Sequence, residues 1–249
     1  MTKAFKKKLN RGDLLIGTIV TLPVTEITEI YCQSGFDWLF VDLEHSAMTL
    51  KDVKCILQTA APSTPCLVRV PAIDEIWIKK VLDLGASGII VPQVKSVEDA
   101  KRAVQLCKYP PQGIRSVGIS RAQGYGGKFQ EYVESANERT IIIIQIEHVD
   151  AVDNIEKILQ VSGIDGVFIG PYDLSASMGK TGLINDPEVQ KAIKQIKNQT
   201  IQAKIPIGIF GATPEAVKSY IKSDYTLIAV GIDTMQIVNA ANHIVRLLK

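Results

Sequence analysis

Cysteine, histidine and aromatic residues are scarce in this chain. Its 249 residues include four cysteines, three histidines and 6% aromatic side chains. The cysteines are scattered, with no C-x-x-C pair, which predicts buried or partly buried free thiols in a reducing compartment. They are Cys32, Cys55, Cys66 and Cys107.

Long apolar runs and a strong net charge are missing as well. No run of about 18 apolar residues occurs, so no membrane-spanning helix and no membrane partner are expected. The N-terminus lacks the apolar stretch of a signal peptide, and the expected location is the cytoplasm. The 28 basic and 26 acidic residues give a net charge of +2, so nothing indicates a nucleic-acid partner. The 46% apolar content fits a globular enzyme.

Apolar runs typical of strands alternate with segments of helical periodicity along the whole chain. Eight β/α units without a linker predict one (β/α)8 TIM barrel, an α/β fold, as a single domain over residues 1–249. A doubly wound open sheet is the alternative, but no G-x-G-x-x-G motif follows the first run. The predicted strands are Leu14–Val20, Trp38–Asp42, Cys66–Val70, Gly88–Val91, Ile141–Ile146, Gly166–Ile169, Ile205–Phe210 and Thr226–Val230.

Two segments depart from this alternation of predicted strands and helices. Residues 109–127 form a long connection rich in proline and glycine, and long loops in compact domains are usually functional or disordered. Because this loop holds Arg121 and Tyr125, we expect it near the active site, where these side chains would contact the outer half of a substrate. The final segment, Met235–Leu248, is amphipathic and would close the barrel or dock on a neighbouring subunit.

Two acids stand where consecutive apolar strands end. Glu147 closes the run Ile141–Ile146, and Asp173 follows the run Gly166–Ile169. A carboxylate is costly inside a buried sheet unless it is paired or holds a metal. Parallel neighbouring strands would bring both acids to the same edge, which predicts a site for one divalent cation that leaves room for substrate and water.

His45 and Arg69 also fall at predicted strand ends, on the face where barrels of this type have their active sites. An imidazole can take and return a proton at neutral pH, and Asp42 and Glu44 are close enough in sequence to orient the His45 ring. Arg69 interrupts an apolar strand, and a buried guanidinium needs a partner. A substrate oxyanion is one such partner, and a structural ion pair with a barrel acid is the alternative.

The turn Gly170–Ser175 ends a strand and opens a short predicted helix. Free backbone N–H groups at a helix start suit a small carboxylate, so Tyr172, Asp173, Leu174 and Ser175 are candidate substrate-binding residues. For His148 we expect a structural or supporting role, because adjacent strand residues point to opposite sides. Asp83, at a helix end before the fourth strand, has either a structural role or a contribution to a neighbouring subunit.

Four motifs give the chain a family resemblance. It resembles the class II pyruvate aldolases of the HpcH/HpaI family over nearly its whole length. The motifs are Gly35-Phe-Asp-Trp-Leu-Phe-Val-Asp-Leu-Glu-His45, Tyr109-Pro-Pro-Gln-Gly-Ile-Arg115, Gln145-Ile-Glu147 and Ile169-Gly-Pro-Tyr-Asp-Leu-Ser-Ala-Ser-Met-Gly179. The resemblance implies a (β/α)8 barrel, a divalent metal such as Mg²⁺, Mn²⁺ or Co²⁺, and reversible cleavage of 4-hydroxy-2-oxo acids to pyruvate and an aldehyde.

The resemblance also implies roles for single residues. Glu147 and Asp173 would hold the metal, and His45, positioned by Asp42, would be the base. Arg69 would bind the pyruvyl oxygen, and Gln145 would line the pocket. A hexamer with the last helix exchanged between subunits is implied as well. The chain departs from the family pattern at Tyr172, often a small residue, and in the loop Ile119-Ser-Arg-Ala-Gln-Gly-Tyr-Gly126, and both departures leave the aldehyde open.

Rival functions remain open from the sequence. A Schiff-base aldolase needs a lysine at a strand end, and no predicted strand ends in one. A related lyase for acyl-CoA esters would use a similar barrel and metal, but no extra basic segment for the CoA phosphates is visible. A non-catalytic barrel that binds 2-oxo acids is the third reading, and the presence of base, arginine and acids together argues against it.

Overall fold

Eight parallel strands close into a barrel in the order in which they follow along the chain. This closed parallel barrel confirms the predicted TIM barrel. The structure, a computed structural model, describes residues 1–61 and 63–249. The strands are β1 (Leu15–Val20), β2 (Trp38–Asp42), β3 (Cys66–Arg69), β4 (Gly88–Val91), β5 (Ile141–Ile146), β6 (Gly166–Ile169), β7 (Ile207–Gly211) and β8 (Leu227–Ile232).

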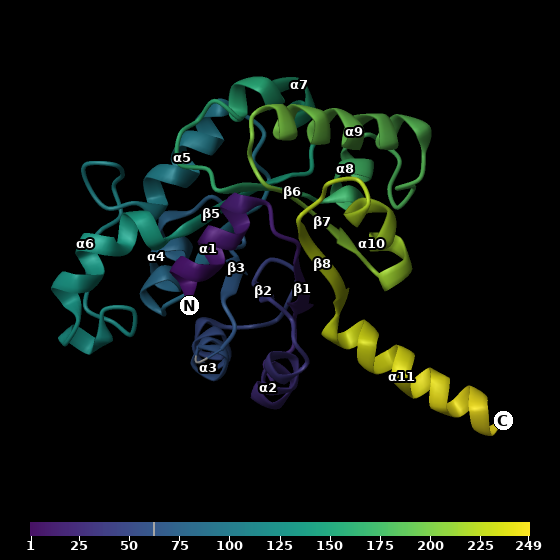
Figure 1. Cartoon of the computed structure of the whole chain (residues 1–249), viewed down its shortest axis with the longest axis horizontal. Helices are drawn as coiled ribbons and strands as arrows, with labels where there is room; N and C mark the ends of the chain where they lie inside the picture. The colour runs from purple at the N-terminus through teal and green to yellow at the C-terminus, as the bar shows by residue number, and fades with distance from the viewer. Residues whose placement is uncertain (62) are drawn as a thin grey trace.

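Helices surround the barrel and join successive strands (Figure 1). Most begin with a side-chain cap or a proline in the first turn, as α3, α5, α9 and α10 do. In the described part of the chain no helix is both long enough and apolar enough to span a membrane. The helices are α1 (Thr2–Arg11), α2 (Thr25–Gln33), α3 (Leu50–Ala60), α4 (Glu75–Asp83), α5 (Val97–Cys107), η1 (Gly124–Gly126), α6 (Phe129–Arg139), α7 (Val149–Ile158), α8 (Pro171–Ser177), α9 (Pro187–Gln202), α10 (Pro214–Ile221) and α11 (Asp233–Leu248).

Two apolar cores hold this arrangement. One lies between strands and helices and takes up the buried stripes of the helices, such as Val53 and Ile56 of α3. The other fills the barrel itself with Trp38, Phe40 and Phe168, whose rings contact one another. The barrel interior is thus packed with side chains and is not an open pore.

The predicted strands agree with the observed ones except at their ends. One shift of two residues is in β7, which begins at Ile207 although the apolar run begins at Ile205. The N–H of Ile205 donates to the carbonyl of Thr200 (3.1 Å) and so completes the end of α9. The residue before it, Lys204, has a φ of +58°, so the chain turns there and joins the sheet two residues later.

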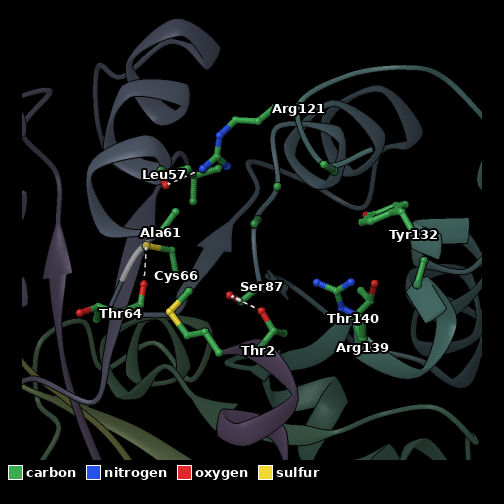
Figure 2. A pocket seen from close by; sticks show the side chains of 15 residues that line it. Thr2, Leu57, Ala61, Thr64, Cys66, Ser87, Arg121, Tyr132, Arg139 and Thr140 are labelled. Carbon is green, nitrogen blue, oxygen red and sulfur yellow. Dashed lines mark hydrogen bonds between the residues drawn. The ribbon is translucent and has the colours of Figure 1, made fainter. Parts of the chain in front are cut away.

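The loop of residues 109–127 lies at the end of the barrel where strands begin. The guanidinium of Arg121 donates to the carbonyls of Leu84 (2.8 Å) and Leu57 (3.2 Å), which follow α4 and lie in α3. Figure 2 shows Arg121 reaching towards Leu57, with Ser87 and Cys66, which lie next to or at the starts of strands, in the same region. The expectation that this loop lies beside the active site of its own chain is therefore wrong, and with it the substrate contact expected of Arg121.

The last helix, α11, projects away from the barrel (Figure 1). Its first residue is fixed: Asp233 is fully buried, and its carboxylate accepts the backbone N–H groups of Thr21 (2.7 Å) and Leu22 (2.8 Å). Beyond this anchor the helix does not close the barrel of its own chain, and it exposes many apolar side chains. These exposed side chains include Ile237, Val238, Ile244, Val245, Leu247 and Leu248.

Candidate active site

A cavity of about 210 Å³ opens at the C-terminal ends of the strands. Asp42 and Arg69 are the last residues of β2 and β3, and Gln145 lies near the end of β5. The turn after β6 adds a second wall. The cavity is lined by Ile19, Thr21, Phe40, Asp42, His45, Arg69, Gln145, Phe168, Gly170, Pro171, Tyr172, Asp173, Phe210 and Ile232.

Asp42 and Arg69 form a buried ion pair across the register of two neighbouring strands. The Nε and Nη2 atoms of Arg69 donate to the two carboxylate oxygens of Asp42 at 2.9 and 2.7 Å. The guanidinium also lies over the ring of Phe40, 5.1 Å from its centroid. The open question about the partner of Arg69 is thus answered in part: a structural ion pair exists, and the guanidinium still lines the cavity.

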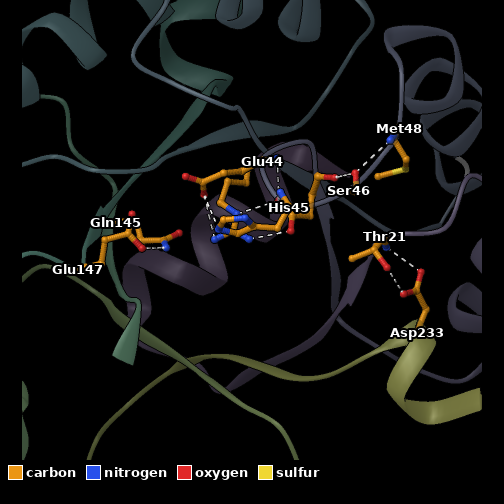
Figure 3. A network of polar contacts seen from close by, with 10 residues as sticks. Thr21, Glu44, His45, Ser46, Met48, Gln145, Glu147 and Asp233 are labelled. Atoms are coloured by element: carbon orange, nitrogen blue, oxygen red, sulfur yellow. Dashed lines mark hydrogen bonds and ion pairs between the residues drawn. The ribbon is translucent and has the colours of Figure 1, made fainter. Parts of the chain in front are cut away.

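His45 stands in the turn that follows β2. Its backbone N–H and that of Glu44 donate to Oδ1 of Asp42 at 3.3 and 3.0 Å. Asp42 therefore holds the backbone that carries His45, whereas the nearest carboxylate to the ring is Glu44, with Oε2 3.9 Å from Nε2. The ring itself is 62% exposed and lines the cavity, so it is open to substrate and solvent, and Figure 3 shows it beside Glu44.

Glu44 lies between His45 and Arg69. Its Oε2 atom is 3.2 Å from Nη1 of Arg69 and forms no hydrogen bond with the described residues. Burial raises the pKa of Glu44 to about 7, against the lowering effect of Arg69. The site therefore contains a second acid close to the guanidinium, beside the pair with Asp42.

Glu147 is almost fully buried directly after β5. Its Oε1 accepts both the backbone N–H and the side-chain amide of Gln93, at 2.8 and 3.0 Å. Its Oε2 accepts the amide of Gln145 (Figure 3). Burial raises the pKa of Glu147 to about 7, and the nearby charges of Glu44 and Asp173 add to this rise.

Gly170 makes room for these groups. A Cβ atom at this position would lie 2.5 Å from Oε2 of Glu147 and 2.9 Å from Nε2 of Gln145. It would also lie 2.9 Å from the Cβ of Glu147, so the hydrogen-bonded pair of Glu147 and Gln145 would have to shift. The glycine of the Gly-Pro turn is therefore required by the close approach of β6 to the acid on β5.

Asp173 is the third residue of α8 and lies on the cavity wall. Gly170 is the N-cap of this helix. Pro171 has no N–H, and the N–H of Leu174 donates to the carbonyl of Gly170 (3.0 Å). The polar groups that this turn can offer to a ligand are therefore the carboxylate of Asp173 and the N–H groups of residues 172 and 173.

The side chains of Leu174 and Ser175 do not face the cavity. Leu174 is fully buried in the core between strands and helices. The Ser175 hydroxyl donates to the carbonyl of Tyr172 (2.6 Å) and accepts the N–H of Gly182 (3.1 Å). Both residues hold the turn in shape. Neither lines the cavity, and the N–H of Leu174, expected to be free for a substrate carboxylate, donates to the carbonyl of Gly170.

A divalent cation with oxygen ligands fits this acid pair. Glu147 is buried and accepts only amide N–H groups, while the nearby guanidinium of Arg69 pairs with other acids. Oε1 of Gln145 is buried without a hydrogen-bond partner in the described part of the chain. A buried carboxylate without a counter-charge is costly, and a cation would relieve this cost. Among residues 1–61 and 63–249, no three His, Cys, Asp or Glu side chains converge as a ready metal cage, so most ligands would come from water and substrate.

Two other candidate residues have structural roles. His148 is the N-cap of α7, where its Nδ1 accepts the N–H of Asp150 (3.2 Å), as expected. Asp83 accepts a hydrogen bond from Arg115 (2.7 Å) and one from Gln123 (3.3 Å). It thereby anchors the loop of residues 109–127 at the opposite end of the barrel.

Gln93 escaped the sequence analysis. It follows β4 after a proline and adopts a φ of +55°, which turns its N–H and its side chain onto Glu147. Its sequence signal was weak: one polar residue after Val91 and Pro92, at the end of a predicted strand. A residue-by-residue reading of every strand end, including the fourth, would have found it.

Known proteins resemble this chain over nearly its whole length. The model of the HpcH/HpaI aldolase/citrate lyase family matches residues 19–240. The chain is 39% identical to a 4-hydroxy-2-oxo-heptane-1,7-dioate aldolase of Shigella sonnei, over 97% of this chain and 93% of that protein. It is 35% identical to a 2-keto-3-deoxy-L-rhamnonate aldolase of Escherichia coli, over 94% and 89%. An HpcH/HpaI aldolase/citrate lyase family protein of Burkholderia cenocepacia superposes with a TM-score of 0.95 at 31% identity, over 98% of each chain.

Proposed function

We propose a reaction for this chain, which belongs to the HpcH/HpaI aldolase/citrate lyase family. It is a metal-dependent class II aldolase that reversibly cleaves a 4-hydroxy-2-oxo acid to pyruvate and an aldehyde. One observation supports this reaction above the others. A buried arginine, an exposed histidine and the acid Asp173 line one cavity, and the second acid, Glu147, lies behind the lining residue Gln145, to which it is hydrogen-bonded. Relatives that are 39% and 35% identical are named for the cleavage of such acids.

Glu147 and Asp173 are the proposed ligands of the cation, which is Mg²⁺, Mn²⁺ or Co²⁺. When bound, the cation supplies a Lewis acid that polarises the 2-oxo group of the substrate. Gln93 and Gln145 hold the Glu147 carboxylate in place with three N–H groups. This support fixes the acid before the cation arrives, and it orients the ligand as partners behind a metal site commonly do.

His45 is the proposed base. It takes the proton from the C4 hydroxyl while the C3–C4 bond breaks, the aldehyde leaves, and the electron pair of that bond passes to C3 as the enolate of pyruvate. A proton then returns to C3 to give pyruvate. Asp42 positions His45 through the backbone of the turn, and Glu44 lies 3.9 Å from its Nε2.

Arg69 is the proposed stabiliser of the enolate oxygen. Its Nε and one N–H of Nη2 are fixed by Asp42, and Nη1 lies 3.2 Å from Oε2 of Glu44. The second N–H of Nη2 and the N–H groups of Nη1 that Glu44 does not engage are left for a developing negative charge. The residues that line the cavity include no lysine, so the lining offers no amine for a Schiff base.

The other side of the cavity is proposed to bind the remainder of the substrate. Gln145 lines the half that faces the acids, and the N–H groups of Tyr172 and Asp173 suit the substrate carboxylate. The Tyr172 ring lies 6.2 Å from that of Phe210, and together they form an aromatic wall. This wall replaces the loop of residues 109–127 as the candidate contact for the aldehyde half within one chain.

The experiment that tests the function is pyruvate release from short 4-hydroxy-2-oxo acids, with and without metal. Treatment with EDTA should abolish the release, and Mg²⁺, Mn²⁺ or Co²⁺ should restore it, because the carbonyl is polarised by the cation. Borohydride added with pyruvate should leave the protein mass unchanged. A pyruvate adduct on a lysine would contradict the metal-dependent mechanism.

Replacement of the proposed base gives a second test. His45→Ala should lower kcat by about 10²–10⁴-fold, the usual contribution of a general base, while metal affinity stays unchanged. His148→Asn is the matched control, since asparagine can still cap α7, and it should retain activity. A loss below about tenfold in His45→Ala at neutral pH would demote His45 to an orienting residue.

The exposed face of α11 supports a proposal about assembly. The helix leaves its own barrel and exposes Ile237, Ile244 and Leu248 on one side, and surfaces of this kind are usually covered by a partner. We expect α11 to pack on a neighbouring copy in a hexamer. Light scattering should then give six times the chain mass of 27.2 kDa.

The same measurement on variants tests the role of the helix. Ile244→Asp should shift the mass towards smaller species, whereas Asn239→Asp, on the opposite side of α11, should leave it unchanged. A monomer in the unaltered protein would contradict the assembly and leave the chemistry of the cavity untouched.

A further inference from the structure

A second cavity, of about 340 Å³, lies at the opposite end of the barrel from the catalytic one. It is bounded by the start of α1, the end of α3, α6 and the segments that precede β4 and β5. It shares no lining residue with the catalytic cavity. Its volume falls at the lower end of the range of about 300–1,000 Å³ typical of small-molecule sites.

Two arginines line this cavity from different sides (Figure 2). Arg121 donates to two backbone carbonyls and Arg139 to the hydroxyl of Ser135 (3.4 Å). Neither guanidinium forms an ion pair with a carboxylate in the described residues, and no described lining residue is an Asp or Glu. The cavity therefore holds two positive charges whose partners are all neutral.

Three acids of α6 line the adjoining hollow with Arg139 but form no ion pair with it, namely Glu131, Glu134 and Glu138. Two other charged groups nearby are paired. Lys6, next to Thr140, lies 2.9 Å from the carboxylate of Asp165. Asp83, the acid closest to the loop, pairs with Arg115 at 2.7 Å. The excess positive charge of the cavity is thus not cancelled by these acids.

Hydroxyl groups complete the lining. The Tyr132 hydroxyl accepts from Arg115 at 3.3 Å, so its own hydrogen is left to donate. The hydroxyls of Thr2 and Ser87 lie 3.1 Å apart, and because only one hydrogen can lie between them, the other is available. Figure 2 shows the Thr2–Ser87 pair and Arg139 on the same side of the cavity. The lining therefore offers hydrogen-bond donors in excess of acceptors.

We propose that this cavity binds a small dianion that carries phosphate or two carboxylate groups, independently of the aldolase reaction. The planar fork of a guanidinium matches both phosphate and carboxylate oxygens, and the hydroxyls add neutral donors. Arg121 is fixed to the ends of α3 and α4, whereas Arg139 is the arginine that can follow the ligand. A bound dianion would link α6, the loop of residues 109–127 and the starts of the central strands.

The test is calorimetric titration of the full chain with inorganic phosphate and, separately, with succinate, at constant ionic strength set with chloride. Saturable binding of at least one anion is expected. In Arg139→Ala its affinity should fall at least ~10-fold, since a charge-assisted hydrogen bond typically contributes about 10–100-fold. Phosphate bound more tightly than succinate would identify a phosphorylated ligand, and the reverse order a dicarboxylate.

Matched variants separate this site from general charge effects. Arg102→Ala, at an exposed position of α5, removes the same charge and should leave the affinity unchanged. Arg139→Lys keeps the charge without the fork and should bind with intermediate affinity, and it also serves if Arg139→Ala does not fold. Absence of saturable binding, or equal affinity in all variants, would overturn the proposal, because the anion would then bind nowhere or in another place such as the catalytic cavity.

Discussion

Arg69→Met is expected to lose about 3–5 kcal/mol of stability, because it leaves the carboxylate of Asp42 buried without its partner. The pair has two hydrogen bonds, at 2.9 and 2.7 Å, and both residues are buried, with exposures of 8% and 2%. Activity should fall by about 10²–10³-fold as well, since one preformed electrostatic contact to the reacting oxygen is removed. Urea denaturation and steady-state kinetics measure the two effects.

Arg69→Lys and the double variant separate the two effects. Lysine keeps the charge but cannot form the paired hydrogen bonds of the guanidinium, so Arg69→Lys should not restore activity. Adding Asp42→Asn to Arg69→Met should recover part of the lost stability, because the unpaired buried charge is gone. Unchanged stability in Arg69→Met would show that Asp42 is not the main partner of Arg69 in solution.

Glu147→Gln should abolish most metal binding while the chain remains folded. The substitution keeps the shape of the side chain but removes its charge, and it turns an N–H group towards the three N–H donors of Gln93 and Gln145. We expect Mn²⁺ affinity to fall by more than the ~10–100-fold that partners behind a metal ligand contribute. Asp173→Asn should behave in the same way, and titration of each purified variant with Mn²⁺ measures the change.

Two further variants calibrate this result. Gln93→Ala removes only the support behind Glu147 and should weaken Mn²⁺ binding by about 10–100-fold. Glu98→Gln removes an exposed carboxylate of α5 and should have no effect. Normal Mn²⁺ titration in both Glu147→Gln and Asp173→Asn would refute the proposed ligands.

The barrel could be predicted from the sequence because each unit repeats the same pattern, a short apolar run followed by an amphipathic helix. The strand ends then located Asp42, Arg69 and Gln145 on one face, and all three line the cavity. The pairing of Asp42 with Arg69 was also within reach, since both end neighbouring parallel strands in register. What the pattern could not give was the direction of single side chains, such as the inward turn of Ser175 onto its own helix.

The expected position of the loop of residues 109–127 is wrong for a simple reason. The expectation rests on composition, since glycines and an arginine are typical of active-site loops. Chain direction was the better guide. A helix that follows a strand returns to the end where strands begin, so the segment between α5 and β5 must lie at that end. Arg121 accordingly binds carbonyls next to α4 and in α3.

The carboxylate of Asp42 fixes the position of two parts of the cavity. The turn that carries His45 and the guanidinium of Arg69 are both bonded to it, so a substitution at any of these three positions alters the background in which the other two act. The aromatic wall of Tyr172 and Phe210 forms no hydrogen bond with this carboxylate in the described residues. Epistasis should therefore be concentrated on the side proposed to hold the 2-oxo acid, while the side proposed for the aldehyde is free to diverge one residue at a time. Relatives named for different acids are what such divergence would produce.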